Sequence, residues 1–309
     1  MKHVLSSLGE ARLLDRIYAR LKRQHLPALV LGPGDDAGLL KVAPGKILVA
    51  THDDLAEGAH FETRWTDFRR LGRKLLRVNL SDLAAMGDVK PLAVLATAAF
   101  PASAPERWFR DFLDGLSADC RLFKTALLGG NLVRSSRLFF GLTALGEANP
   151  SGILRRSGAK PGDLLYGVGP LGLAGRGLAA LRRRAKDPAG VTAFWEPEPQ
   201  FRAARLLARS RLATALIDNS DGLSRSAWEI ARASGTSFRL DLSHAPVAGN
   251  PDAGEDYGLL FSVPPPRLAR LKAVLPAAYP LGAVSKRGAR ALSAHGGYDP
   301  FAAKAPHAL

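Results

Sequence analysis

Acidic residues stand at the expected end of a strand or helix in five separate segments of the chain. The segments are GPGDDAGLL (32–40), KILVATHDDLAEGAHF (46–61), RVNLSDLAAMGD (77–88), ALIDNSDGLS (215–224) and DAGEDYGLLF (252–261). Any one of these carboxylates can be explained as a turn residue or a helix N-cap. Five coincidences of this kind are less expected than one shared purpose, so we predict that the five segments contribute to a single acidic site.

A group of carboxylates without cysteine is typical of a site for a hard, oxygen-seeking cation such as magnesium. Carboxylates repel phosphates unless bound cations reverse the local charge. The acidic site therefore predicts a phosphate-bearing ligand that is bridged by magnesium. The sequence contains neither the glycine-rich lysine loop of the common nucleotide-binding fold nor the motif set of protein kinases.

The composition is that of a globular protein with an unusually high positive charge. The 309 residues are enough for two domains, 47% of them are hydrophobic, and the formal net charge is +15. Such a charge is compatible with nucleic acid, anionic lipid or phosphorylated small molecules as partners. The basic residues are dispersed, and the densest run, LRRRAKD at 181–187, is explained as the solvated face of a helix. We therefore predict no nucleic-acid partner.

Cysteine content and hydropathy indicate where the protein is expected to work. Cys120 is the only cysteine of the sequence, so no intrachain disulfide can form. The first residues, MKHVLSSLGEARLLDRI, have no sustained apolar core, and the most apolar stretch, 91–100, is too short to span a bilayer. We expect a cytoplasmic protein with no membrane partner.

Helical and extended patterns alternate along the chain, which is typical of an α/β or α+β protein. Residues 67–78 form a helical pattern with Asp67 as its N-cap, and a separate short helix is expected from Asp82 to Gly87. Further helices are expected over 105–119, over 172–186, from about Pro199, and over 222–235.

A break in these patterns divides the chain into two parts. Residues 148–163, ANPSGILRRSGAKPGD, are rich in glycine, proline and serine. Such a composition is typical of a connection between domains. We predict an N-terminal domain over 1–148 and a C-terminal domain over 149–309.

Nine sequence blocks occur along the chain, from residue 8 to residue 301: LGEARLL, GDDAGLL, HDDLAEGAHF, NLSDLAAMG, LLGGN, RRSGAKPGD, IDNSDGLS, GEDYGLLF and GGYDPF. In this order they resemble the thiamine-monophosphate kinase family, within the superfamily that includes aminoimidazole ribonucleotide synthetase. The resemblance implies two α/β domains. The N-terminal domain would contain a mixed sheet with helices, bind ATP and magnesium, and pair into a homodimer. The implied reaction transfers the γ-phosphoryl group of ATP to thiamine monophosphate, giving thiamine diphosphate and ADP.

The resemblance also implies roles for individual residues. The residues implied to bind magnesium are Asp36, Thr51, His52, Asp53, Asp82, Asn131, Asp218 and Asp221. Among them, Asp53, Asp82 and Asp218 are implied to act in catalysis through the metal. The residues implied to contact ATP are Gly129, Gly130, Arg156 and Ser220. The residues implied to face the substrate are His60, Glu255, His295 and Tyr298. No protein nucleophile is needed, because phosphoryl transfer depends mainly on positioning and charge neutralisation.

Three positions depart from the family pattern. Asn131 stands in place of a magnesium-binding aspartate, His52 in place of a threonine, and His295 in place of an aromatic residue, with Tyr298 close by. These departures leave two alternatives open: a related ATP-using enzyme with another phosphate acceptor, and a nucleotide-binding protein without turnover. His60 also has a simpler explanation as a histidine that serves its own turn.

Overall fold

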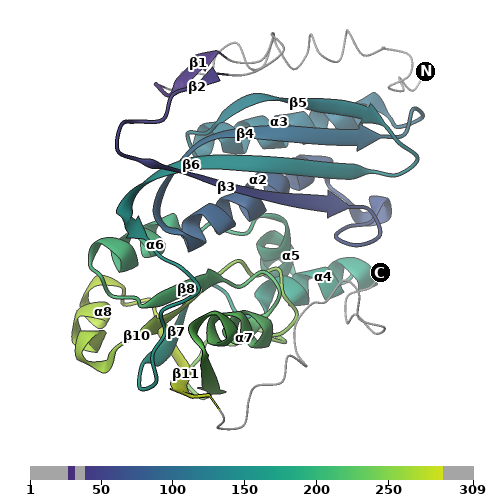
Figure 1. Ribbon diagram of the computed structural model, residues 1–309. Helices are drawn as coiled ribbons and strands as arrows, with labels where there is room; N and C mark the ends of the chain where they lie inside the picture. Colours follow the sequence, from purple (N-terminus) through teal and green to yellow (C-terminus); the bar gives the residue numbers. More distant parts are fainter. Residues whose placement is uncertain (1–26, 32–38, 288–309) are drawn as a thin grey trace. The chain divides into compact units, whose positions relative to one another are not determined.

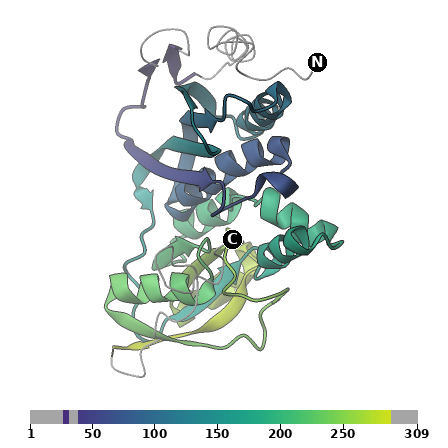
Figure 2. The same cartoon turned by 90° about the vertical axis from the view of Figure 1, so that its right-hand side faces the viewer.

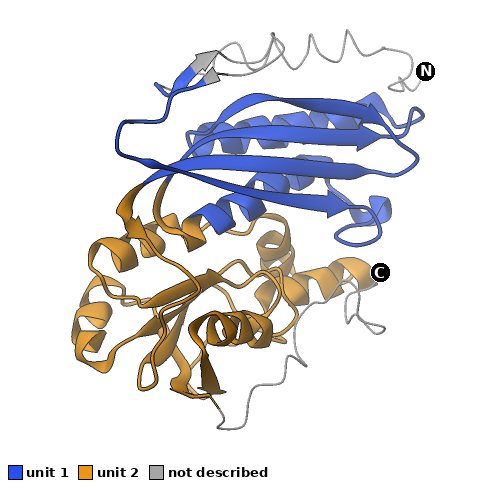
Figure 3. Cartoon of the chain, viewed as in Figure 1, with its two compact units in different colours: residues 1–83, 90–148, 309 blue, residues 84–89, 149–308 orange. Residues whose placement is uncertain are grey.

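The chain divides into two compact units (Figure 3). The structure is a computed structural model that describes residues 27–31 and 39–287. Unit 1 comprises residues 1–83, 90–148 and 309, and unit 2 comprises residues 84–89 and 149–308. The division is therefore not a single cut in the chain, because the short segment 84–89 groups with the second unit.

Unit 1 is built on a four-stranded mixed sheet that is covered by two long helices. Its elements are β1 (Leu29–Leu31), β2 (Leu39–Leu40), β3 (Ile47–Ala56), a 3-10 helix (Thr63–Trp65), α2 (Phe68–Ala85), β4 (Gly87–Phe100), α3 (Glu106–Leu122), β5 (Ala126–Arg134) and β6 (Phe139–Ile153). The strand order is β3-β6-β4-β5 (Figure 1), with β3 and β6 antiparallel and β4 and β5 parallel. Helices α2 and α3 both lie on one face of this sheet (Figure 2).

The helix expected over 67–78 is present, and Asp67 is its cap. The Asp67 carboxylate accepts hydrogen bonds from the backbone N–H groups of Arg69 at 2.9 Å and Arg70 at 3.1 Å. The apolar stripe of the helix faces the core of unit 1, as the 3.6-residue period predicts. Its buried members are Phe68, Leu71, Leu75 and Val78.

The prediction of a separate short helix from Asp82 to Gly87 is wrong, because Asp82 lies inside α2. The residues between 79 and 85 include no glycine or proline that would end a helix. Leu80 and Leu83 are fully buried and extend the apolar stripe of α2. Gly87 has a φ of +99° and begins strand β4 instead of closing a helix.

Unit 2 contains a five-stranded sheet in the order β8-β10-β7-β11-β9, and every pair of neighbours is antiparallel. Its elements are β7 (Leu164–Val168), α4 (Leu173–Arg183), α5 (Pro188–Trp195), α6 (Phe201–Arg209), β8 (Ala215–Asp218), α7 (Leu223–Ser234), β9 (Thr236–Leu240), β10 (Leu259–Val263), a 3-10 helix (Pro265–Arg267), α8 (Leu268–Val274) and β11 (Tyr279–Lys286). No helix in the described part of the chain is long and apolar enough to cross a membrane.

Successive side chains of unit 2's central strands point into two separate cores. In β10, Leu259 and Phe261 pack in one core with residues of α6 and α8, whereas Leu260 packs in the other core with residues of α7. This follows from the two-residue period of a strand that is covered on both faces. Helix α7 ends at Gly235, which has a φ of +66°, as the sequence predicts. The α/β architecture expected from the sequence is confirmed.

Candidate active site

Strand β3 and helix α2 of unit 1 bring three of the predicted metal ligands together. The Thr51 hydroxyl donates a hydrogen bond of 2.6 Å to the Asp82 carboxylate. Asp53 lies two residues beyond Thr51, so both side chains leave β3 on the same face. The Asp53 backbone N–H donates a 2.9 Å hydrogen bond to the Asn79 side chain, three residues before Asp82 on α2. Residues three apart share one side of a helix, so Asn79 and Asp82 both face β3. The two-residue period of the strand and the helical period of α2 together produce the contacts Thr51–Asp82 and Asp53–Asn79.

Asn79 holds this arrangement in place and was missed by the sequence reasoning. It is fully buried, its Oδ1 accepts from Asp53, and its Nδ2 donates a 2.9 Å hydrogen bond to the Leu75 carbonyl. The sequence carries a signal for it, because asparagine is a poor helix former and here interrupts an apolar helical stripe. A buried amide at such a position indicates a structural hydrogen bond.

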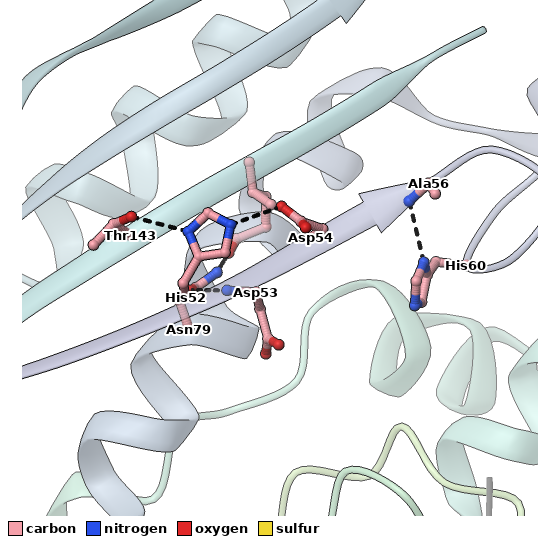
Figure 4. A network of polar contacts seen from close by, with 8 residues as sticks. His52, Asp53, Asp54, Ala56, His60, Asn79 and Thr143 are labelled. Carbon is pink, nitrogen blue, oxygen red and sulfur yellow. Dashed lines mark hydrogen bonds and ion pairs between the residues drawn. The ribbon is translucent and has the colours of Figure 1, made fainter. Parts of the chain in front are cut away.

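His52 lies on the opposite face of β3 from Asp53, so the structure does not bring its ring beside the Asp53 carboxylate, and its role as a metal ligand stays a prediction. Figure 4 shows the His52 ring and the Asp53 carboxylate on opposite sides of the strand. The His52 Nε2 is 3.0 Å from the Asp54 carboxylate, and its Nδ1 is 2.9 Å from the Thr143 hydroxyl of β6. The three side chains form an exposed polar network on that face of the sheet.

His60 follows the end of β3 and takes part in its turn. Its Nδ1 accepts a 3.1 Å hydrogen bond from the Ala56 backbone N–H (Figure 4). One ring nitrogen therefore serves the turn, as the simpler explanation of this histidine predicts. The contact with the substrate stays a prediction for His60.

The paired glycines of β5 have different surroundings. A Cβ at Gly130 would lie 1.9 Å from the carbonyl oxygen of Ala96 on β4, whereas a Cβ at Gly129 would meet nothing nearer than a Leu95 methyl group at 3.8 Å. Close packing of two strands thus explains Gly130, and Gly129 has an open side where a ligand could approach. Asn131 follows them with an exposed side chain.

In unit 2, the remaining acidic residues lie at the end of strand β8 and in two loops. Asp218 is the buried last residue of β8, and α7 begins after Gly222, which has a φ of +100°. The first turn of α7 is capped by Asp252, which accepts hydrogen bonds from the Ser224 backbone N–H at 2.7 Å and the Ser224 hydroxyl at 2.9 Å.

Electrostatics link Asp221 with two other predicted site residues. Burial raises the pKa of Asp221; the positive charges of Arg225 and Arg156 oppose this rise, and the negative charge of Glu255 adds to it. Ser220 joins the same group, because its carbonyl accepts a 2.6 Å hydrogen bond from the Glu255 backbone N–H. A half-buried carboxyl with a raised pKa gains from a nearby cation, because positive charge favours its ionised form. Arg225 had not been singled out from the sequence.

Comparisons with known proteins identify the family of the chain. Residues 34–148 match the family model of the AIR synthase related protein, N-terminal domain, and residues 160–292 match that of the C-terminal domain. The chain is 32% identical over 282 residues to the thiamine-monophosphate kinase of Synechococcus elongatus, which covers 84% of each protein. It belongs to the thiamine-monophosphate kinase family. The predicted two-domain fold of the superfamily is thereby confirmed.

Solved structures of the family agree with this assignment. The crystal structure of thiamine-monophosphate kinase from Stenotrophomonas maltophilia has a TM-score of 0.77 and 30% identity, covering 89% of this chain and 93% of that chain. A structure described as AaThiL complexed with AMPPCP and TMP has a TM-score of 0.68 and 26% identity, covering 92% and 93% of the two chains.

The donor atoms fit magnesium that arrives with a phosphate ligand. Among the residues that the structure describes, no group of three or more His, Cys, Asp or Glu side chains lies close enough to hold a metal ion. The single acidic cluster expected from five segments is therefore not seen within those residues. Magnesium is commonly held by one or two carboxylates, with phosphates and waters completing its shell. Oxygen donors such as the Thr51–Asp82 pair suit that mode of binding.

Three residues of the family's pattern lie outside the described part of the chain. They are Asp36, His295 and Tyr298. Their predicted roles therefore stay predictions.

Proposed function

We propose that this protein transfers the γ-phosphoryl group of ATP to thiamine monophosphate, giving thiamine diphosphate and ADP. The observation that carries the proposal is the pair of hydrogen bonds that fixes Thr51 to Asp82 and Asp53 to Asn79 in a chain of this family. It places oxygen donors for a hard cation on rigid elements, which phosphoryl transfer requires. The AaThiL complex with AMPPCP and TMP supports both ligands in a relative.

The proposal gives the residues of each unit a role. In unit 1, Thr51, Asp53 and Asp82 hold magnesium, and Gly129 allows the backbone to approach the nucleotide. In unit 2, Asp218 and Asp221 hold magnesium, Ser220, Arg156 and Arg225 contact the nucleotide, and Glu255 contacts the thiamine compound. Bound magnesium neutralises the phosphate charges. The acceptor phosphate is already ionised near neutral pH, so no protein group is needed to remove a proton from it.

A homodimer formed through unit 1 is part of the proposal, as is a cytoplasmic location. Each strand of the unit 1 sheet carries an exposed large apolar side chain: Leu48, Leu95, Val133 and Phe139. An interface with a second copy of the chain would cover these side chains. Sedimentation of the full chain should give twice its monomer mass, and a monomer at all concentrations would remove this part of the proposal.

The activity is tested directly with the purified full chain, ATP, magnesium and thiamine monophosphate. We expect thiamine diphosphate and ADP in equal amounts, and no product when either thiamine monophosphate or magnesium is left out. ADP formation with another phosphorylated acceptor alone would replace the proposal by a related ATP-using enzyme. Nucleotide binding without any ADP release would indicate a protein without turnover.

A further inference from the structure

The segment Gly254–Gly258 of unit 2 has an unusual backbone. Glu255 has a φ of +67° and Tyr257 a φ of +51°, with Gly254 at +75° before them. Residues with bulky side chains rarely adopt the left-handed region, and they do so only where the surrounding structure fixes them. This part of the chain carries Glu255, which the proposed function places against the substrate.

On one side, backbone hydrogen bonds fix this segment to the loop that follows β8. The N–H of Glu255 donates to the Ser220 carbonyl at 2.6 Å, and the N–H of Tyr257 donates to the Asn219 carbonyl at 3.0 Å. In return, the N–H of Asn219 donates to the Gly258 carbonyl at 2.8 Å. The loop between Asp218 and Asp221 and the segment that carries Glu255 are thus one hydrogen-bonded assembly.

On the other side, the Asp256 carboxylate fixes the segment to the first turn of α4. Its two oxygens accept hydrogen bonds from the backbone N–H groups of Gly172 and Ala174, the latter at 2.9 Å. Asp256 is only 1% exposed. The first N–H groups of a helix have no partner within it, and the helix dipole favours a negative charge there. The Asp256 carboxylate is therefore held in place both by its two hydrogen bonds and by the favourable electrostatics of the helix N-terminus.

We propose that Asp256 is a positioning residue, which holds Glu255 and the Asn219–Ser220 loop in the conformation that binds substrate and metal. Both oxygens of the Asp256 carboxylate are hydrogen-bonded to the backbone of α4, so in this proposal the residue acts through the backbone on both sides of its own position. The inference rests on the proposed function, because the roles of Glu255 and Asp221 come from it. A purely structural alternative is that Asp256 only caps α4.

The test compares Asp256→Asn with a matched cap in the same unit. Asparagine keeps the size of the side chain, but one of its two hydrogen-bond acceptors becomes a donor. We expect Asp256→Asn to raise the KM for thiamine monophosphate at least about tenfold and to speed amide hydrogen exchange at Glu255 and Tyr257 by a similar factor. Asp256→Glu keeps both acceptor oxygens and should restore part of each effect.

The matched control is Asp187→Asn. Asp187 caps α5 by accepting from the Gly190 N–H at 3.0 Å and pairs with Arg176 at 2.7 Å. This variant should lower the melting temperature without changing the KM or the exchange at Glu255 and Tyr257.

Three outcomes decide between the explanations. If Asp256→Asn lowers the melting temperature and leaves both the KM and the exchange of the two amides unchanged, Asp256 is only a cap and the inference is overturned. If the wild-type chain shows no kinase activity, the proposed function fails, and the exchange measurement still decides whether Asp256 holds the segment. If Asp256→Asn does not fold, hydrogen exchange in the wild-type chain takes its place: amides of Glu255 and Tyr257 that open together with those of Gly172 and Ala174 support the inference, and amides that open independently of them overturn it.

Discussion

The two units place their candidate site residues in different ways. In unit 1, Thr51, Asp53 and Asp82 lie within a regular strand and a regular helix, and the periods of these elements decide which side chains meet. In unit 2, Asp221 and Glu255 lie in loops. The loop that carries Glu255 is held by hydrogen bonds to parts of the chain that are distant in sequence. Regular elements thus fix a site by local geometry, whereas loops need anchors.

The largest effect expected from this comparison is between two neighbouring residues of β3. Asp53→Asn should lower kcat/KM by about a thousandfold, because it removes a charge that acts on the transferring phosphate. Asp54→Asn should leave activity unchanged and alter stability by less than about 1 kcal/mol, because Asp54 pairs with His52 on the exposed face. Steady-state kinetics with varied magnesium, together with urea unfolding, measure both. Equal losses of activity in the two variants would show that the face of the strand does not decide function.

A smaller effect separates the two glycines of β5. Gly130→Ala should destabilise the protein by about 1–3 kcal/mol, because its Cβ would collide with the Ala96 carbonyl oxygen. Gly129→Ala should leave stability nearly unchanged, since its Cβ would make only an ordinary van der Waals contact of 3.8 Å with a Leu95 methyl group. The free energy of unfolding in urea is the measurement. If Gly129→Ala also left the KM for ATP unchanged, the predicted approach of the nucleotide at this position would be wrong.

Much of unit 1 could be predicted from sequence because its site follows periodic patterns. The spacing of apolar residues alone predicts the buried stripe of α2 and its Asp67 cap, and both are confirmed. The errors came from ending elements at acidic residues. Aspartate is depleted in strands, so the adjacent Asp53 and Asp54 do not mark this segment as part of β3. The strand continues to Ala56, and the two-residue period then puts His52 and Asp53 on opposite faces.

The anchors of unit 2 could not be predicted, because nothing local marks them. Asp252 caps α7 through Ser224, which lies 28 residues earlier in the chain, and Asp256 caps α4 through Ala174, which lies 82 residues earlier. Both sit in a segment that reads as an ordinary acidic turn. Such pairings are decided by the topology of the sheet, which brings β8, β10 and β7 side by side.

The smallest predicted effect compares two helix caps, Asp67→Ala in unit 1 and Asp252→Ala in unit 2. Each variant removes a side chain that accepts two hydrogen bonds at the first turn of a helix, so each should lower the free energy of unfolding by about 1 kcal/mol. Their kinetic effects should differ. Only Asp252→Ala should raise, by several-fold, the magnesium concentration needed for half-maximal activity.

The reason lies in the distance between each cap and its site. Asp82 lies about 20 Å along the rigid helix α2 from the Asp67 cap, so fraying of the first turn of α2 does not reach Asp82. Asp252 instead contacts the site loop directly, because a Cβ at Gly222 would lie only 2.8–2.9 Å from the Asp252 backbone. Loss of the cap should therefore loosen the loop that carries Asp221. Equal shifts of the magnesium requirement in both variants would mean that both units transmit local disorder alike, which would contradict the distinction between a site held by periodicity and a site held by anchors.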